Sequence, residues 1–128
     1  MTKEQMNELL SDIVAMYAEP YGILAARASK KVTLRLMESS VEETITNCPY
    51  CNYALARRIL IECGTILEEN KDEGTLCGII MSGSLNMNPA IVAIAISDDG
   101  IHIKAVAKEG LIKQHTAQKA IAIFKSFL

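Results

Sequence analysis

The chain lacks any run of the roughly 18 to 20 consecutive apolar residues that a membrane-spanning helix requires. Its longest apolar candidate, from 89 to 96, is only as long as a strand. Its first residues also lack the basic start and apolar segment of a secretory signal. We therefore expect a protein of the cytoplasm that does not enter a membrane, in which the cysteines are mostly reduced thiols or metal ligands.

The chain also lacks an excess of positive charge. Thirteen Lys and Arg residues stand against fifteen Asp and Glu, for a formal charge of -2. Nucleic-acid binding depends on a strong basic excess, so we do not expect a nucleic-acid partner. Proline and glycine are few, at 3 and 7 residues, which leaves little room for long linkers. With 128 residues, half of them apolar, the sequence predicts one folded domain over residues 1–128.

Helical spacing of apolar residues marks the N-terminal half. Thr2 with Gln5 has the spacing of a capping box, and a helix is predicted to follow until Pro20. From about Lys31 the pattern alternates as in a strand, up to Met37.

The segment 39–47 reads as a polar helix or loop, because Ser40 with Glu43 again has capping-box spacing. With Asn47 as a plausible N-cap, a long helix is predicted from about Cys48 to Glu69.

The C-terminal half changes to a strand pattern. Segments 75–81, 90–97 and 101–107 are rich in Ile and Val, and Asp99-Gly100 predicts a tight hairpin turn between the last two. A closing helix is predicted from its apolar face, which consists of Ala117, Ala120, Ile121, Phe124, Phe127 and Leu128.

This order of elements predicts an α+β fold with helices packed on one face of a small antiparallel meander sheet. The order resembles that of profilin-like and roadblock-like domains, which serve as ligand-sensing or dimerisation modules. The resemblance implies a binding or partner role. A short chain this rich in apolar residues exposes much apolar surface, and a meander leaves a free sheet edge. We therefore predict a homodimer.

One motif suggests chemistry. Cys48-Pro49-Tyr50-Cys51, followed by the segment 52–58, resembles the active-site turn and first helix of a glutaredoxin. The resemblance implies that Cys48 is the nucleophile and Cys51 the resolving thiol, and a helix start there would favour the thiolate. The rest of the chain departs from that family, because no buried strand is predicted before the motif and no Thr-Val-Pro segment follows. A thioredoxin fold is therefore not expected.

Two other interpretations of the cysteines stay open. Cys48 and Cys51 could hold zinc or an iron-sulfur cluster, with Cys77 as a third ligand. Cys63 lies twelve residues after Cys51, which on one continuous helix is about 18 Å, too far to share the ion. Alternatively, all four thiols are small buried apolar groups.

A binding site for a small ligand is predicted near the seven-residue connection 83–89. Its candidate residues are Ser82, Ser84, Asn86, Asn88 and His102. Strand alternation turns His102 away from Ile101 and Ile103, so we expect the imidazole to face solvent or a ligand. The sequence thus favours a small-ligand-binding, sensing or interaction domain. A thiol-disulfide oxidoreductase or redox sensor and a zinc- or iron-sulfur-binding protein are the alternatives.

Overall fold

The structure is a computed structural model that describes residues 1–46, 48, 51–110 and 112–128. It has four helices and a five-stranded sheet, so the predicted α+β class with an antiparallel sheet is confirmed. The elements in chain order are α1 (Lys3–Ala18), a 3-10 turn (Glu19–Tyr21), α2 (Ile23–Arg35), β1 (Glu38–Ile45), α3 (Tyr53–Cys63), β2 (Thr65–Asn70), β3 (Thr75–Ser82), a 3-10 turn (Ser84–Asn86), β4 (Asn88–Ser97), β5 (Gly100–Lys108) and α4 (Thr116–Lys125). Among the described helices, none is long and apolar enough to cross a bilayer.

The strands pair antiparallel in the order β1-β5-β4-β3-β2. The predicted hairpin between β4 and β5 is confirmed, and Gly100 adopts a φ of 139° that a residue with a side chain rarely adopts. A Cβ on Gly100 would also lie 2.1 Å from the carbonyl oxygen of Ile45. The two sheet edges are β1 and β2, both of which carry glutamates.

Three boundaries predicted for the N-terminal half are wrong. The alternating segment from Lys31 belongs to α2 as far as Arg35, and the strand begins only at Glu38. Residues 39–45, predicted to be a polar helix or loop, form most of β1, because pairing with β5 on one side overrides their polar composition. The helix predicted from Cys48 to Glu69 extends only from Tyr53 to Cys63, since Gly64 ends it and β2 follows.

The first and last helices agree better with the sequence. The capping box of Thr2 and Gln5 at the start of α1 is confirmed. The apolar stripe of α4 is buried as expected as far as Phe124, but Phe127 and Leu128 lie beyond the helix and are exposed.

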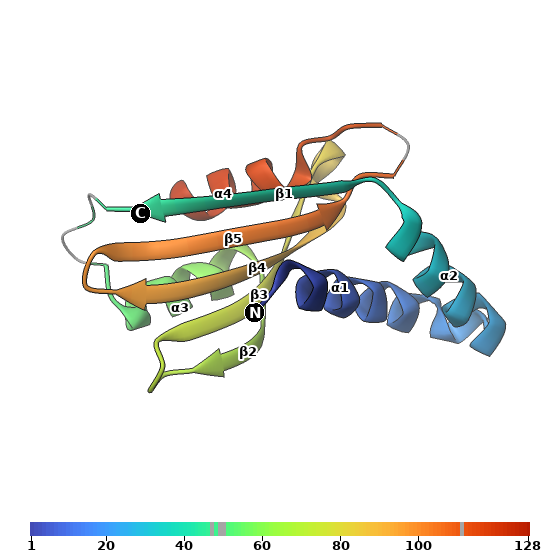
Figure 1. The fold of residues 1–128 in the computed structure, drawn as a ribbon, viewed down its shortest axis with the longest axis horizontal. Coiled ribbons are helices and arrows are strands. Elements are labelled where there is room, and N and C mark those ends of the chain that lie inside the picture. The colour runs from blue at the N-terminus through green and yellow to red at the C-terminus, as the bar shows by residue number, and fades with distance from the viewer. Residues whose placement is uncertain (47, 49–50, 111) are drawn as a thin grey trace.

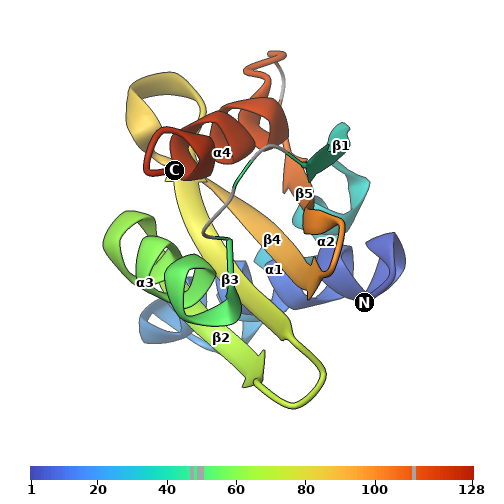
Figure 2. The same cartoon turned by 90° about the vertical axis from the view of Figure 1, so that its left-hand side faces the viewer.

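The two faces of the sheet are covered differently. On one face, here called the covered face, α3 and α4 pack over the main core, as Figure 2 shows. On the other, here called the open face, α1 packs through Met6 and Leu10 against Ile79, Ile91 and Val106. The α1–α2 pair then extends away from the sheet (Figure 1), and α2 packs against α1.

Candidate functional site: a cysteine pair and an open sheet face

Cys48 and Cys51 form a disulfide in the connection between β1 and α3. Both residues are partly buried, and Cys51 packs against the core of the covered face. The amide of Cys51 donates a hydrogen bond of 3.1 Å to the carbonyl oxygen of Cys48. Pro49 and Tyr50, the two residues of the motif between the cysteines, lie outside the described residues. The bond fits a redox-active thiol pair.

The cysteine pair precedes α3 and is not part of its first turn. Asn52 is the N-cap, and its side chain accepts a hydrogen bond of 2.8 Å from the amide of Leu55. The predicted N-cap, Asn47, lies outside the described residues. The glutaredoxin-like placement of Cys48 on the first helical turn is therefore wrong, because the competing cap at Asn52 shifts the helix start beyond both cysteines.

The other two cysteines lie apart from this pair. Cys63 ends α3, and its partial burial raises the pKa of its thiol. Cys77 is buried on the open face, where burial, aided by Glu68, raises its pKa to about 11. Because Cys51 packs on the covered face, the sheet separates it from Cys77. Within the described part of the chain, no three His, Cys, Asp or Glu side chains are grouped to hold a metal ion.

The ligand-binding residues predicted near the connection 83–89 mostly form hydrogen bonds with the connection between β5 and α4. The Ser82 hydroxyl donates to the carbonyl oxygen of Thr116, and the Asn88 amide donates to the carbonyl oxygen of Lys108 and the hydroxyl of Thr116. The amide of Ser84 donates to the side chain of Gln114.

Asn86 is exposed in the 3-10 turn and has a φ of 54°. Neither it nor the other three candidates of this region lines the larger cleft described below.

Glu109 is a buried carboxylate that the sequence did not single out. It accepts hydrogen bonds from the amide and hydroxyl of Thr116, at 3.0 and 2.8 Å, and from the amide of Gln114. Burial disfavours its charge, but these hydrogen bonds outweigh burial and lower its pKa. The carboxylate thus caps the start of α4. Glu109 and Thr116 are seven positions apart, so no local spacing rule identifies the contact.

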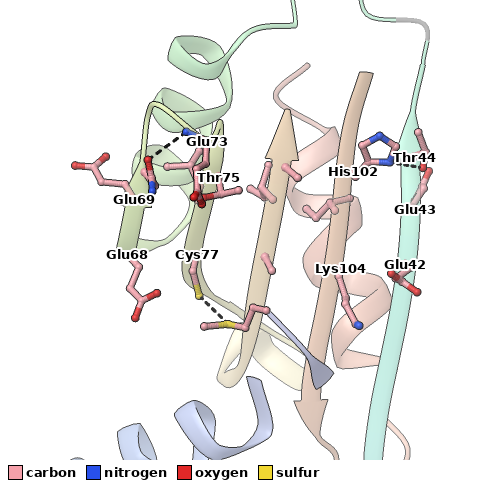
Figure 3. Close-up of a pocket in the computed structure, with 17 residues that line it drawn as sticks. Glu42, Glu43, Thr44, Glu68, Glu69, Glu73, Thr75, Cys77, His102 and Lys104 are labelled. Carbon is pink, nitrogen blue, oxygen red and sulfur yellow. Dashed lines mark hydrogen bonds between the residues drawn. The ribbon is translucent and has the colours of Figure 1, made fainter. Parts of the chain in front are cut away.

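The open face holds a cleft of about 1000 Å³ beside α1. Strand register explains its lining, because Glu42, Lys104, Ala93, Cys77 and Glu68 form one row across all five strands. Figure 3 shows Lys104 and Glu42 on one side of this cleft and Cys77 and Glu68 on the other. Ala93, in the middle of this row, has a small side chain that fills little of the cleft.

His102 lies in the next row and lines the cleft. Its Nδ1 is 2.9 Å from the Thr44 hydroxyl, and its Nε2 is 3.0 Å from the Ser97 hydroxyl and 3.1 Å from a carboxylate oxygen of Asp99. One tautomer satisfies the contacts with Thr44 and Asp99: Nε2 donates its proton to Asp99, and Nδ1 accepts from Thr44. Hydrogen bonds from Ser97 and then His102 lower the pKa of Asp99.

These contacts orient the imidazole at the edge of the cleft. Alternation of the strand identified the exposure of His102, whereas its partners come from β1 and the hairpin turn and could not be read from spacing.

The cleft has an acidic rim. Glu42 and Glu68 flank it on the two edge strands, and Glu73 adds a third carboxylate from the β2–β3 turn. Within the described residues, none of the three forms an ion pair, whereas nearby Glu69 pairs with Arg57 at 2.6 Å. Among the described residues that line the cleft, Lys104 is the one lysine or arginine. The open face therefore has an acidic rim with a partly apolar floor.

Comparison of the chain with protein-family models, curated proteins and solved structures finds no match.

Proposed function

We propose that this domain is a thiol-disulfide redox switch whose reversible reaction joins Cys48 and Cys51. The observation that carries the proposal is their disulfide in the connection that leads into α3. Cys63 and Cys77 are free thiols, so only this pair is joined. A change in its redox state would act directly on the connection between β1 and α3.

The reaction is an exchange with a low-molecular-weight disulfide. By resemblance to the glutaredoxin motif, the Cys48 thiolate attacks that disulfide, and one reduced thiol leaves. The Cys51 thiolate then attacks the mixed disulfide, and the second reduced thiol leaves. The two protein thiols lose two electrons and two protons, and the external disulfide gains both. Excess reduced thiol reverses the sequence.

The short spacing of Cys48 and Cys51 supports a redox role for the disulfide more than a role in stabilising the fold. Chain-entropy arguments give a disulfide that closes so short a loop only about 2 kcal/mol of stabilisation, against about 3 kcal/mol for a loop of 15 residues. The surrounding fold also differs from a thioredoxin fold, because β1 is an edge strand of an antiparallel sheet. We therefore propose a redox-sensing role for the pair and assign it no catalytic turnover.

The test is a redox titration with reduced and oxidised glutathione, whose disulfide releases two separate thiols as in the reaction above. At each ratio the protein is quenched in acid, alkylated and weighed by mass spectrometry. We expect one transition in which two thiols react together. Cys63→Ser should keep the transition, whereas Cys48→Ser should abolish it. A pair that stays reduced in excess oxidant, or a transition that survives in Cys48→Ser, would overturn the proposal.

We also propose a binding role for the open face. The supporting observation is the cleft of about 1000 Å³, the size of typical ligand pockets, at which His102 is held by three partners. Bulk added to the floor by Ala95→Leu should block binding by this face, while Lys119→Glu on α4 should leave it unchanged. Equal behaviour of the two variants in a binding assay would contradict this role.

A further inference from the structure

Helix α2 presents a face that nothing in the described chain covers. It packs along α1, while Leu24 is 80% exposed and Ile23 72% exposed. These apolar side chains lie in the first turn of α2, and three exposed basic side chains follow on the same side of the helix, namely Arg27, Lys31 and Arg35. Lys30 differs, because it reaches back to α1 and forms ion pairs of 2.6 Å with Glu8 and Asp12. The exposed side of α2 is therefore both apolar and positively charged.

The uncovered half of the open face has the complementary character. Helix α1 covers the part of the sheet around Ile91 and Val106, whereas none of the described helices lies over the rows toward the β4–β5 hairpin (Figure 1). Ala93 and Ala95 form the floor there beside the single cation Lys104, and Glu42, Glu68 and Glu73, which form no ion pair within the described residues, stand at its rim.

The dimensions of the two surfaces also agree. The 13 residues of α2 make a helix about 20 Å long. Five strands about 4.8 Å apart span about 19 Å from edge to edge. One helix of this length therefore reaches across the whole uncovered region, beside α1.

The chain's own α2 does not lie in this region. Only Leu36 and Met37 separate α2 from β1, which begins at Glu38, the end of the strand opposite the cleft residue Thr44. The ammonium group of Lys108, the residue paired with Glu38, donates to the carbonyl oxygen of Leu36 at 3.4 Å. The C-terminal end of α2 is thus anchored at the far end of the sheet, with α1 between it and the cleft.

We infer that the partner in the binding role proposed above for the open face, on which this inference rests, is the α2 helix of a second copy of this chain, which occupies the uncovered half of that face. Each copy carries both surfaces, so two copies can exchange helices about a two-fold axis and leave neither surface free. Arg27, Lys31 and Arg35 of one copy then face Glu42, Glu68 and Glu73 of the other. Leu24 and Ile23 pack over Ala93 and Ala95.

A single tryptophan tests this interface, because the chain has none of its own. Leu24→Trp places the indole on the exposed side of α2. We expect its emission to shift to the blue as protein concentration rises from about 1 µM to about 1 mM, with a parallel doubling of mass by light scattering. Met87→Trp, on a side chain that is 71% exposed elsewhere, should show no shift. A mass of 14.0 kDa throughout, or doubling without the shift, overturns the inference.

Charge exchange gives the second readout. Lys31→Glu should weaken dimerisation at least tenfold, and Lys119→Glu on α4 should not. Combining Lys31→Glu in turn with Glu42→Lys, Glu68→Lys and Glu73→Lys should restore affinity in at least one double variant. Failure of every combination overturns the charge pairing and the inference with it. These variants leave both Cys48 and Cys51 in place, so the result is independent of the redox proposal.

Discussion

The two faces of the sheet use the same strands for different purposes. On β4, Ala90, Val92 and Ile94 point into the core under α3 and α4, and all three are buried. Their neighbours Ala93 and Ala95 point to the open face and line the cleft, where both side chains remain partly exposed, although Ala93 also packs against the α1 cluster. The covered face thus holds the larger buried cluster, while the open face holds a smaller one and a cleft.

The two faces should differ most in the unfolding free energy that is lost when one buried side chain of each face is truncated. Phe124 of α4 is fully buried in the core of the covered face, and Phe124→Ala should cost about 3 to 5 kcal/mol of unfolding free energy. Leu10 of α1 is 1% exposed but belongs to the smaller buried cluster of the open face, so Leu10→Ala should cost about 2 to 3 kcal/mol. Urea unfolding at a fixed redox state measures both. A larger loss for Leu10→Ala would reverse the assignment of the faces.

Enlarging an alanine sharpens the comparison within one strand. Ala90 is fully buried on the covered face, so Ala90→Leu should overpack the core and cost about 1 to 3 kcal/mol. Ala95→Leu adds the same atoms above the cleft floor and should change the unfolding free energy by less than about 0.5 kcal/mol. The same urea experiment compares them, at a concentration low enough to keep the chain monomeric. Equal losses would mean that the open face is as tightly packed as the other.

A substitution of Glu109 tests how much the hydrogen bonds at the start of α4 contribute to stability on the covered face. Glu109→Gln replaces an acceptor of several hydrogen bonds with an amide that meets the donors of Thr116, and should cost about 1 to 3 kcal/mol at pH 7. The folded pKa of Glu109 lies below its ordinary value of 4.5, so its contribution is present above that pH and is lost as pH falls through the folded pKa. Stability of the native chain and the variant should therefore converge in acid. A gap that stays constant with pH would mean that the charge of Glu109 contributes nothing.

Periodicity predicted the C-terminal half of the fold well. Strands β3, β4 and β5 and the helix α4 each have a strong pattern over seven residues or more, and the turn at Gly100 has its own backbone requirement. Patterns in the segment from Lys31 to Thr46 misled, because strand-like alternation fell inside α2, and β1 is a polar edge strand whose conformation depends on pairing with β5.

The candidate sites were only partly readable. The spacing of Cys48 and Cys51 made their pairing predictable, since two residues between cysteines suit a short disulfide loop. The position of the two cysteines relative to α3 could not be predicted, because Asn52 competes with Asn47 as the helix N-cap. The cleft could not be predicted at all, because it depends on how far α1 covers the sheet.

The smallest effect concerns the thiol of Cys77 on the open face, whose ionisation should not change the unfolding free energy at neutral pH. Its neutral thiol carries no charge in either state at pH 7, but burial, aided by Glu68, raises its pKa to about 11. The unfolded chain releases this proton near the ordinary value of 9.0, so any contribution of the thiol to stability is present below that pH and is lost as pH rises toward 11.

Alkylation with iodoacetamide in a chain carrying Cys48→Ser and Cys51→Ser measures Cys77 directly, with Cys63 as the internal reference. Burial also raises the pKa of Cys63, but Cys63 is less buried and should react faster. We expect the rate at Cys77 to keep rising about tenfold per pH unit beyond pH 9, because the thiolate is the reacting species. In urea both rates should level off near pH 9. If the native rate at Cys77 also levels off there, solvent reaches the sulfur from the cleft that Cys77 lines, and burial does not hold its pKa up.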